Sequence, residues 1–138
     1  RKLTAADGRS ADHFGHAMDV SGHFALIGTA PDDSPSARPE REAAHVFERV
    51  GDGWVERTRL APPNDGQVRD FGRTVAIDGD TAVIGAPTEG GAGAVHVYVR
   101  IGGELISQAR LTPESGSNDR FGAAVAALGR PVVRASAD

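Results

Sequence analysis

Apolar and polar residues alternate over short stretches of this chain, and glycine interrupts the alternation every few residues. Met18 and Val20 lie two positions apart, and so do Val75 and Ile77. A spacing of two places both side chains on one face of a strand. No stretch keeps the 3.6-residue period of a helix. The pattern therefore predicts many short strands and little helix.

The first part of the chain, residues 17–60, is predicted to contain four consecutive strands, which we call the first set. Residues 17–28 carry two apolar runs about the turn glycine Gly22, which is the pattern of a hairpin. A polar loop follows, and a strand begins at His45. The turn Gly51-Asp52-Gly53 then leads into a last strand that ends near Leu60. This set predicts one antiparallel sheet.

The second set repeats this order. A hairpin turns at Gly79, a third strand contains His96, and Gly102-Gly103 precedes a last strand that ends at Leu111. The third and fourth strands of the two sets have the same spacing, because 60 − 45 and 111 − 96 both equal 15 residues. The two sets differ mainly in the length of one loop, where insertions are tolerated.

The dipeptide Phe-Gly opens each set and marks the repeat. It occurs at 14–15, 71–72 and 121–122, at steps of 57 (71 − 14) and 50 (121 − 71) residues. Another glycine follows each Phe by eight positions, and the second strand twice leads into a Gly…Ala-Pro run (28–31 and 85–87). Repeats of this period indicate a propeller, a solenoid or an array, because one unit cannot bury its own apolar face.

The repeat predicts an all-β fold built of four-stranded propeller blades, two complete and two partial. We divide the single segment 1–138 into a closing strand (1–8), two blades (12–66 and 69–116) and a partial blade (119–138). A ring needs roughly four to eight blades, and unpaired strand edges must be covered. We therefore expect further blades, from a second copy or from a longer chain. The start at Arg1 rather than Met fits a processed form or a piece.

Residues 75–87, Val-Ala-Ile-Asp-Gly-Asp-Thr-Ala-Val-Ile-Gly-Ala-Pro, together with the Phe-Gly dipeptides, resemble the FG-GAP repeat of integrin-α-like β-propellers, in its bacterial form. The resemblance implies a non-catalytic ligand-binding or adhesion module that is extracellular or on the cell surface. It also implies a binding face built from loops at one end, here residues 32–43 and 88–93. These implications rest on analogy between folds.

Calcium is a cofactor that the resemblance allows, because many members carry an Asp-x-Asp-x-Asp-Gly loop in the hairpin turn. The turns here are Ser21-Gly22-His23, Asp78-Gly79-Asp80 and Leu128-Gly129-Arg130. They are short and have few carboxylates, whereas calcium takes six or more oxygens. We therefore expect no calcium and no other cofactor. His13, His16 and His23 surround one hairpin, but nothing in their spacing indicates a metal site.

Four residues are candidates for ligand contact. Trp54 and Tyr98 are aromatics that an exposed sugar platform would use, and Asp32 and Asp33 lie in a predicted binding loop. Against this, Tyr98 is equivalent to Phe47 and would pack as it does, and Asp in loops mostly forms turns. Two alternatives stay open: an oligomeric propeller lectin that binds carbohydrate, and a structural or accessory segment of a larger secreted protein.

Other conspicuous residues have structural explanations. The three repeat Phe residues are expected to pack between blades, and the following Gly admits a close backbone or a positive φ. His45 and His96 are equivalent, so we expect one repeated structural role. The glycine-rich loop 90–93 precedes no helix and is predicted to be a flexible connection rather than a phosphate cradle.

Composition narrows the function classes. The net charge is −4, which argues against broad nucleic-acid binding. There is no cysteine, hence no disulfide framework and no thiolate metal site. No apolar run is long enough to span a membrane. No nucleophile elbow or metalloprotease motif occurs, and we predict that the chain is not an enzyme. A protein or carbohydrate ligand is the expected partner.

Overall fold

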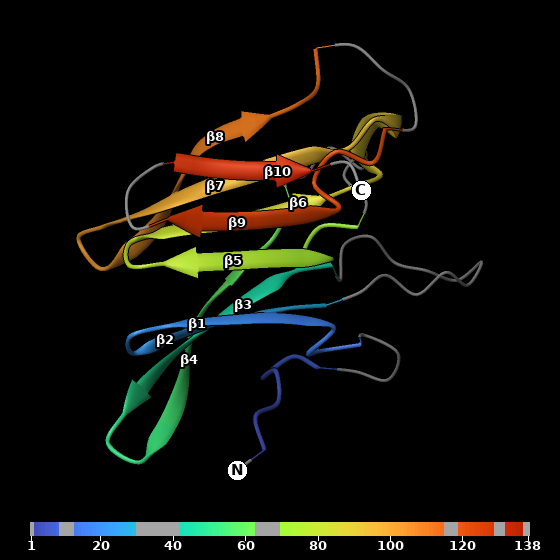
Figure 1. Cartoon of the computed structure of the whole chain (residues 1–138). Helices are drawn as coiled ribbons and strands as arrows, with labels where there is room; N and C mark the ends of the chain where they lie inside the picture. The colour runs from blue at the N-terminus through green and yellow to red at the C-terminus, as the bar shows by residue number, and fades with distance from the viewer. Residues whose placement is uncertain are drawn as a thin grey trace.

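The computed structural model describes residues 2–8, 13–29, 42–62, 70–114, 119–128 and 132–136. Over these residues the chain is all-β, as predicted, with two four-stranded antiparallel sheets and one two-stranded sheet (Figure 1). The first blade is β1 (Ala17–Ser21), β2 (Phe24–Gly28), β3 (Ala44–Val50) and β4 (Gly53–Leu60). The second blade is β5 (Thr74–Asp78), β6 (Thr81–Ala86), β7 (Ala94–Ile101) and β8 (Glu104–Leu111). The partial blade is β9 (Ala124–Leu128) with β10 (Val132–Ser136).

The strands of each blade pair in sequence order, each with the next. Both complete blades carry a register shift at the same place, between Val46 and Phe47 and between Val97 and Tyr98. Such a bulge increases the local twist of the strand. The two blades that repeat in the sequence therefore also repeat in structure, including the position of this bulge.

Residues 2–8 differ from expectation, because they form turn and coil where a closing strand was predicted for 1–8. They lie against the first blade through side chains. Leu3 packs on the cluster of Ala25, Ile27 and Phe47, and the Ala6 amide donates to Glu56 Oε2 over 3.2 Å. A backbone amide that is bonded to a carboxylate contributes nothing to a strand ladder.

The Phe-Gly dipeptide forms the same turn three times. The residue before each Phe has a positive φ: 50° at His13, 62° at Asp70 and 54° at Arg120. The glycine after each Phe also has a positive φ, of 90° to 95°. Within a blade, the amide of this glycine donates to the carbonyl of a glycine at the end of the second strand or one residue before it. Gly15 donates to Gly28 over 3.1 Å, and Gly72 donates to Gly85 over 3.2 Å. Glycine is required there because side chains rarely tolerate that conformation.

Neighbouring blades meet backbone to backbone at these glycines. A Cβ added to Gly28 of the first blade would lie 1.9 Å from the Gly72 carbonyl oxygen of the second. A Cβ added to Gly85 would likewise lie 2.2 Å from the Gly122 oxygen of the partial blade. We call this contact the glycine joint. It places each Phe-Gly turn directly on the preceding blade.

The opening strands β1, β5 and β9 lie side by side across the three blades (Figure 1). Side chains of β1 bond the backbone of the second blade. Asp19 Oδ2 accepts from the Ile77 amide over 2.8 Å, and Ser21 Oγ accepts from the Gly79 amide over 3.0 Å. These bonds fix the second blade to the first at the end opposite the glycine joint.

The apolar core lies between the blades. One cluster joins the first and second blades and contains the fully buried Phe71 together with Leu26, Ile84 and Tyr98. A second joins the second blade to the partial one through residues that include Val83 and Phe121. The prediction that the repeat Phe residues pack between blades is confirmed for Phe71.

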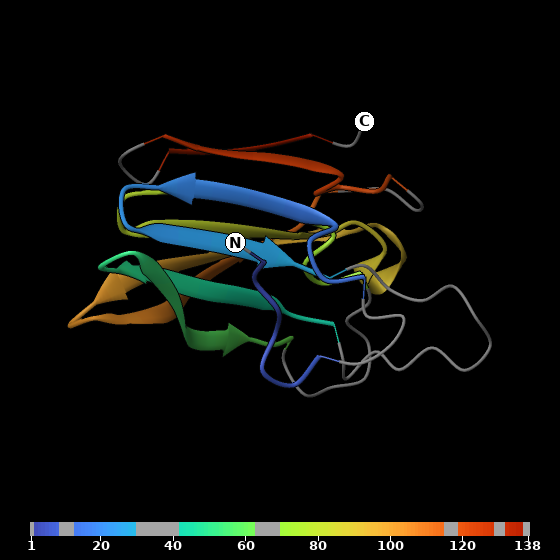
Figure 2. The same cartoon turned by 90° about the horizontal axis from the view of Figure 1, so that it is seen from below.

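The β1–β2 hairpin turn and the loop after β6 lie at opposite ends of the blades (Figure 2). That loop carries a short 3-10 helix, η2 (Glu89–Gly91), closed by the Gly93 amide donating to the Glu89 carbonyl over 2.8 Å. The glycine-rich loop was expected to be a flexible connection, and it instead forms a tight turn. This turn brings Glu89 into the interior, where only 4% of it is exposed.

Candidate ligand cleft between two blades

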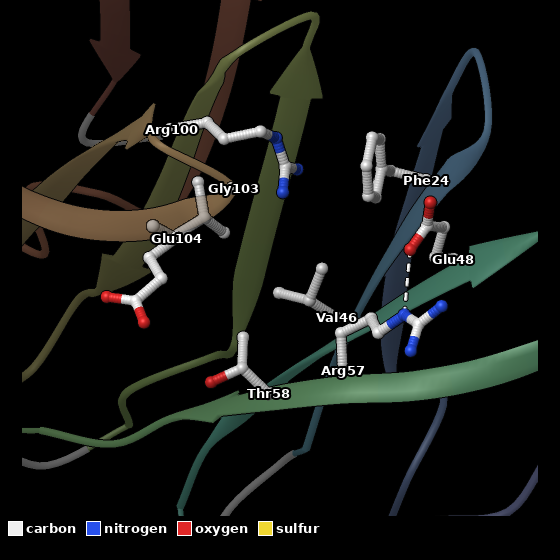
Figure 3. A pocket seen from close by; sticks show the side chains of 9 residues that line it. Phe24, Val46, Glu48, Arg57, Thr58, Arg100, Gly103 and Glu104 are labelled. Carbon is white, nitrogen blue, oxygen red and sulfur yellow. Dashed lines mark hydrogen bonds and ion pairs between the residues drawn. The ribbon is translucent and has the colours of Figure 1, made fainter.

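A cleft of about 580 Å³ opens between the first and second blades. Its first wall consists of residues from β2, β3 and β4, and its second wall comes from the end of β7, the turn after it and the start of β8 (Figure 3). The volume is within the range of small-ligand sites. The lining residues are Phe24, Val46, Glu48, Arg57, Thr58, Arg100, Gly103, Glu104 and Leu105.

Arg100 is the charged residue that bridges the two walls. It lies on β7, and its guanidinium carbon is 3.7 Å from the ring centroid of Phe24 in the first blade, a cation–π contact (Figure 3). Only 13% of its side chain is exposed. Its Nε and Nη2 are buried and have no hydrogen-bond partner in the part of the chain that the structure describes. The carboxylate of Asp80 is 3.6 Å from Nε, which is too long for a hydrogen bond.

The other charged side chains of the cleft are arranged differently. Arg57 Nε donates to Glu48 Oε2 over 2.7 Å within the first blade, which neutralises both groups (Figure 3). Glu104 is exposed at the start of β8. The apolar part of the lining comes from Phe24, Val46 and Leu105. The cleft therefore combines an apolar surface with one incompletely bonded cation.

A buried polar cluster lies at the far end of the second blade. His96 Nε2 is 2.6 Å from Glu89 Oε2, and Arg110 Nε donates to Glu89 Oε1 over 2.6 Å. The ring of Phe71 meets His96 edge-on at 5.1 Å. We call Glu89, His96 and Arg110 the triad; Glu89 and His96 are buried, whereas the Arg110 side chain is 49% exposed. It links η2, β7 and β8.

The pKa values of Glu89 and Tyr98 are shifted in and beside the triad. Burial alone would raise the pKa of Glu89, but the hydrogen bonds and positive charges of His96 and Arg110 together outweigh it, so the pKa lies below the ordinary value. Burial raises the pKa of Tyr98, and the negative charge of Glu89 raises it further. The Glu89 carboxylate thus contributes to the pKa shift of Tyr98, which comes first from the burial of the tyrosine.

The first blade holds its equivalent histidine with a different carboxylate. His45 Nδ1 is 2.6 Å from Glu56 Oε1, on the neighbouring strand β4. The Phe14 ring meets His45 edge-on at 5.3 Å, as Phe71 meets His96. In the first blade Glu42 serves the joint instead, because its Oε2 accepts from the Phe71 amide over 3.0 Å. Both histidines thus pair with a carboxylate, which suits a structural role.

The sequence-derived ligand residues do not come together at one place. Tyr98 is 8% exposed and belongs to the core between the first two blades. Trp54 is half-buried against the cluster of Ala25, Ile27 and Phe47 in the first blade. Asp32 and Asp33 lie outside the described residues, as does most of the loop 32–43. The cleft lies near the end of β7 that carries Arg100, and the loop 88–93 precedes the other end of that strand.

Among the described residues, no group of three or more His, Cys, Asp or Glu side chains is placed to hold a metal ion. The same residues include no helix with the length and hydropathy needed to cross a membrane.

The stacked four-stranded blades with their repeated Phe-Gly turns define a propeller-like repeat protein. The family model of the FG-GAP repeat matches residues 1–47 and 54–98. This match spans more than half of the chain, and the chain belongs to the FG-GAP repeat family. A comparison with curated proteins finds no significant match.

Sequence reasoning missed Arg100, Glu89 and Arg110. One signal was present, because Arg49 and Arg100 each lie four residues after the repeated histidine, and Arg59 and Arg110 each lie fourteen after it. Their partners were not deducible in the same way. Glu89 lies in the loop before its histidine, whereas Glu56 lies on the strand after its own.

Proposed function

We propose that this chain is a non-catalytic, extracellular ligand-binding or adhesion module. FG-GAP repeats are found in propeller modules with that role, and they typically occur in extracellular proteins. The observation that carries the proposal is the cleft between the blades. Its wall holds a guanidinium with two nitrogens that find no hydrogen-bond partner among the described residues. Buried polar groups are nearly always paired, so such a group at an open cleft favours an external partner.

The test is a binding screen against immobilised protein, with matrix and cell-surface proteins in one arm and a glycan array in the other. Saturable binding of a protein that Arg100→Gln weakens supports the proposal. Binding of glycans alone would support the lectin alternative instead, although the burial of Tyr98 counts against that alternative. Absence of any saturable binding, or a turnover of the bound molecule, would overturn the proposal.

A second role, as a segment that assembles with other blades, is favoured by one exposed apolar face. Met18 and Val20 on β1 are 59% and 50% exposed. Their equivalents on β5 are Val75 and Ile77, which pack against the first blade, and Ile77 is only 4% exposed. The face of β1 thus has the composition of a surface that another FG-GAP blade covers.

Light scattering over a concentration series tests this assembly. We expect self-association that Val20→Asp abolishes and that Val55→Asp, on the exposed outer strand β4, leaves intact. A monomer at every concentration would show that a second copy does not cover this face.

A further inference from the structure

We infer that the cleft between the first and second blades binds a carboxylate group of a peptide ligand, and that Arg100 recognises it. The inference rests on the proposed ligand-binding function and names the chemistry of the site. A guanidinium carries five N–H donors, and two of them can bond the two oxygens of one carboxylate in parallel.

The unmet donors of Arg100 lie on one edge of its guanidinium. Nε and Nη2 are buried and have no hydrogen-bond partner among the described residues. The N–H groups of these two nitrogens point in the same direction, so together they form the fork that holds a carboxylate through two parallel bonds. A single carboxylate would therefore satisfy both nitrogens at once, with one oxygen on each.

The chain's own carboxylate holds this edge poorly. Asp80 Oδ1 is 3.6 Å from Arg100 Nε, and the Asp80 side chain is 74% exposed. At that separation no hydrogen bond forms, and solvent around the exposed Asp80 carboxylate screens the attraction. Asp80 therefore marks where negative charge is favourable without supplying the hydrogen bonds. A ligand carboxylate would displace this weak contact.

Phe24 fixes the position of the cation. The guanidinium carbon lies over its ring, 3.7 Å from the centroid, and the buried Nε and Nη2 still have no hydrogen-bond partner among the described residues. The ring belongs to the first blade and Arg100 to the second, so the recognising group is held only where both blades meet. Val46 and Leu105 add apolar surface for the body of the ligand.

The remaining charges favour one carboxylate rather than two. Arg57 is paired with Glu48 over 2.7 Å, which offsets its positive charge. Glu104 adds a negative charge to the lining, which disfavours a highly anionic ligand such as a phosphate. An acidic side chain, or the free C-terminus, of a peptide with apolar neighbours fits this combination.

The repeat supplies a matched control. Arg49 occupies the equivalent position in the first blade, and its amide donates to the His23 carbonyl over 2.7 Å, as the Arg100 amide does to Asp80. Arg49 is exposed and is not among the cleft residues. Arg49→Gln thus removes the same charge from the same place in a blade without touching the cleft.

The experiment is an NMR titration of the isotope-labelled chain with three tripeptides. The first is Leu-Glu-Leu with both ends blocked, the second is its Leu-Gln-Leu counterpart, and the third is Leu-Gln-Leu with a free C-terminus. We expect saturable shifts of the Arg100 Nε–H and of the Phe24 and Leu105 amides with the first or third peptide and none with the second. The responding peptide identifies the source of the carboxylate.

Substitutions then assign the role to Arg100. We expect Arg100→Gln to weaken binding about tenfold or more and Arg49→Gln to leave it unchanged. Asp80→Asn should strengthen it about two- to fivefold, because the internal competitor is removed.

Equal shifts with the blocked Glu and Gln peptides, or no shift with any peptide, would overturn the inference on the unmodified protein, even if Arg100→Gln fails to fold. Binding of some other ligand class in the wider screen would then leave the proposed function standing and remove only the carboxylate assignment.

Discussion

The Gly28 α-carbon and the Gly72 carbonyl oxygen, from neighbouring blades, approach so closely that a methyl group on Gly28 would lie 1.9 Å from that oxygen. Backbone on both sides leaves no flexible group that could move aside. We expect Gly28→Ala to destabilise the fold by about 3 kcal/mol or more, at the upper end of overpacking effects. Urea unfolding followed by circular dichroism measures it.

Gly51→Ala is the control for this substitution. Gly51 has a φ of 59°, but nothing lies within 4 Å of its added Cβ. It should therefore lose only the cost of a left-handed conformation, about 1–2 kcal/mol. Similar losses for the two variants would show that the joint is not the tight contact described above.

Phe71 should contribute more to stability than Phe14, although both occupy the same position of the repeat. Phe71 is fully buried between two blades, whereas Phe14 is half-buried on the outer side of the first. We expect Phe71→Ala to cost about 3–5 kcal/mol and Phe14→Ala clearly less. Denaturant midpoints compare them, and an equal loss would contradict the packing difference.

Glu89→Gln should weaken the fold in a pH-dependent way. The folded pKa of Glu89 is below its ordinary value of 4.5, so its ionised form stabilises the chain above that pH, and this contribution is lost as the pH falls through the folded pKa. We expect a loss of about 2–3 kcal/mol at neutral pH. The difference from the unmodified chain should narrow below about pH 4.5.

Unfolding free energies across a pH series test this, with Glu104→Gln as the exposed control. Glu104→Gln should follow the unmodified chain throughout. A gap between Glu89→Gln and the unmodified chain that stays constant down to acid pH would mean that the triad does not lower the pKa of Glu89.

Tyr98 should link stability to alkaline pH. Its folded pKa is raised above 10.0, so the stability that it contributes is complete below that value and is lost as the pH rises toward the folded pKa. Tyr98 is the only tyrosine in the chain, so tyrosinate absorbance reports it alone. We expect a midpoint above 10.0 in the native chain and about 10 in urea. Coincident midpoints would refute the shift.

The blade architecture could be predicted from the sequence because the fold needs particular residue types at fixed positions. The glycines of the joint and the Phe of each turn recur at positions fixed by backbone geometry, so their spacing predicts the blades. The segment 1–8 was misread because the leucine that matches a closing strand packs through its side chain, without a ladder.

The cleft could not be predicted from the sequence, because its lining residues are far apart in the chain and belong to different blades. Phe24 and Arg100 lie 76 positions apart (100 − 24) on different blades, and no period relates an aromatic on one to a cation on the next. The position equivalent to Phe24 in the second blade is Thr81, so the contact does not recur there. Because the contact between Phe24 and Arg100 occurs in one blade and not in the other, comparing the repeats does not reveal it.

The glycine joint also bears on how such a chain can change in length. Each unit carries both halves of the contact, a Phe-Gly turn on one side and a strand-ending glycine on the other. A tandem duplication of one unit in the gene would therefore create a matching interface at once, with no compensating substitution. Whole blades could therefore be gained or lost in single genetic events. A side chain at one joint glycine would prevent the next blade from packing there.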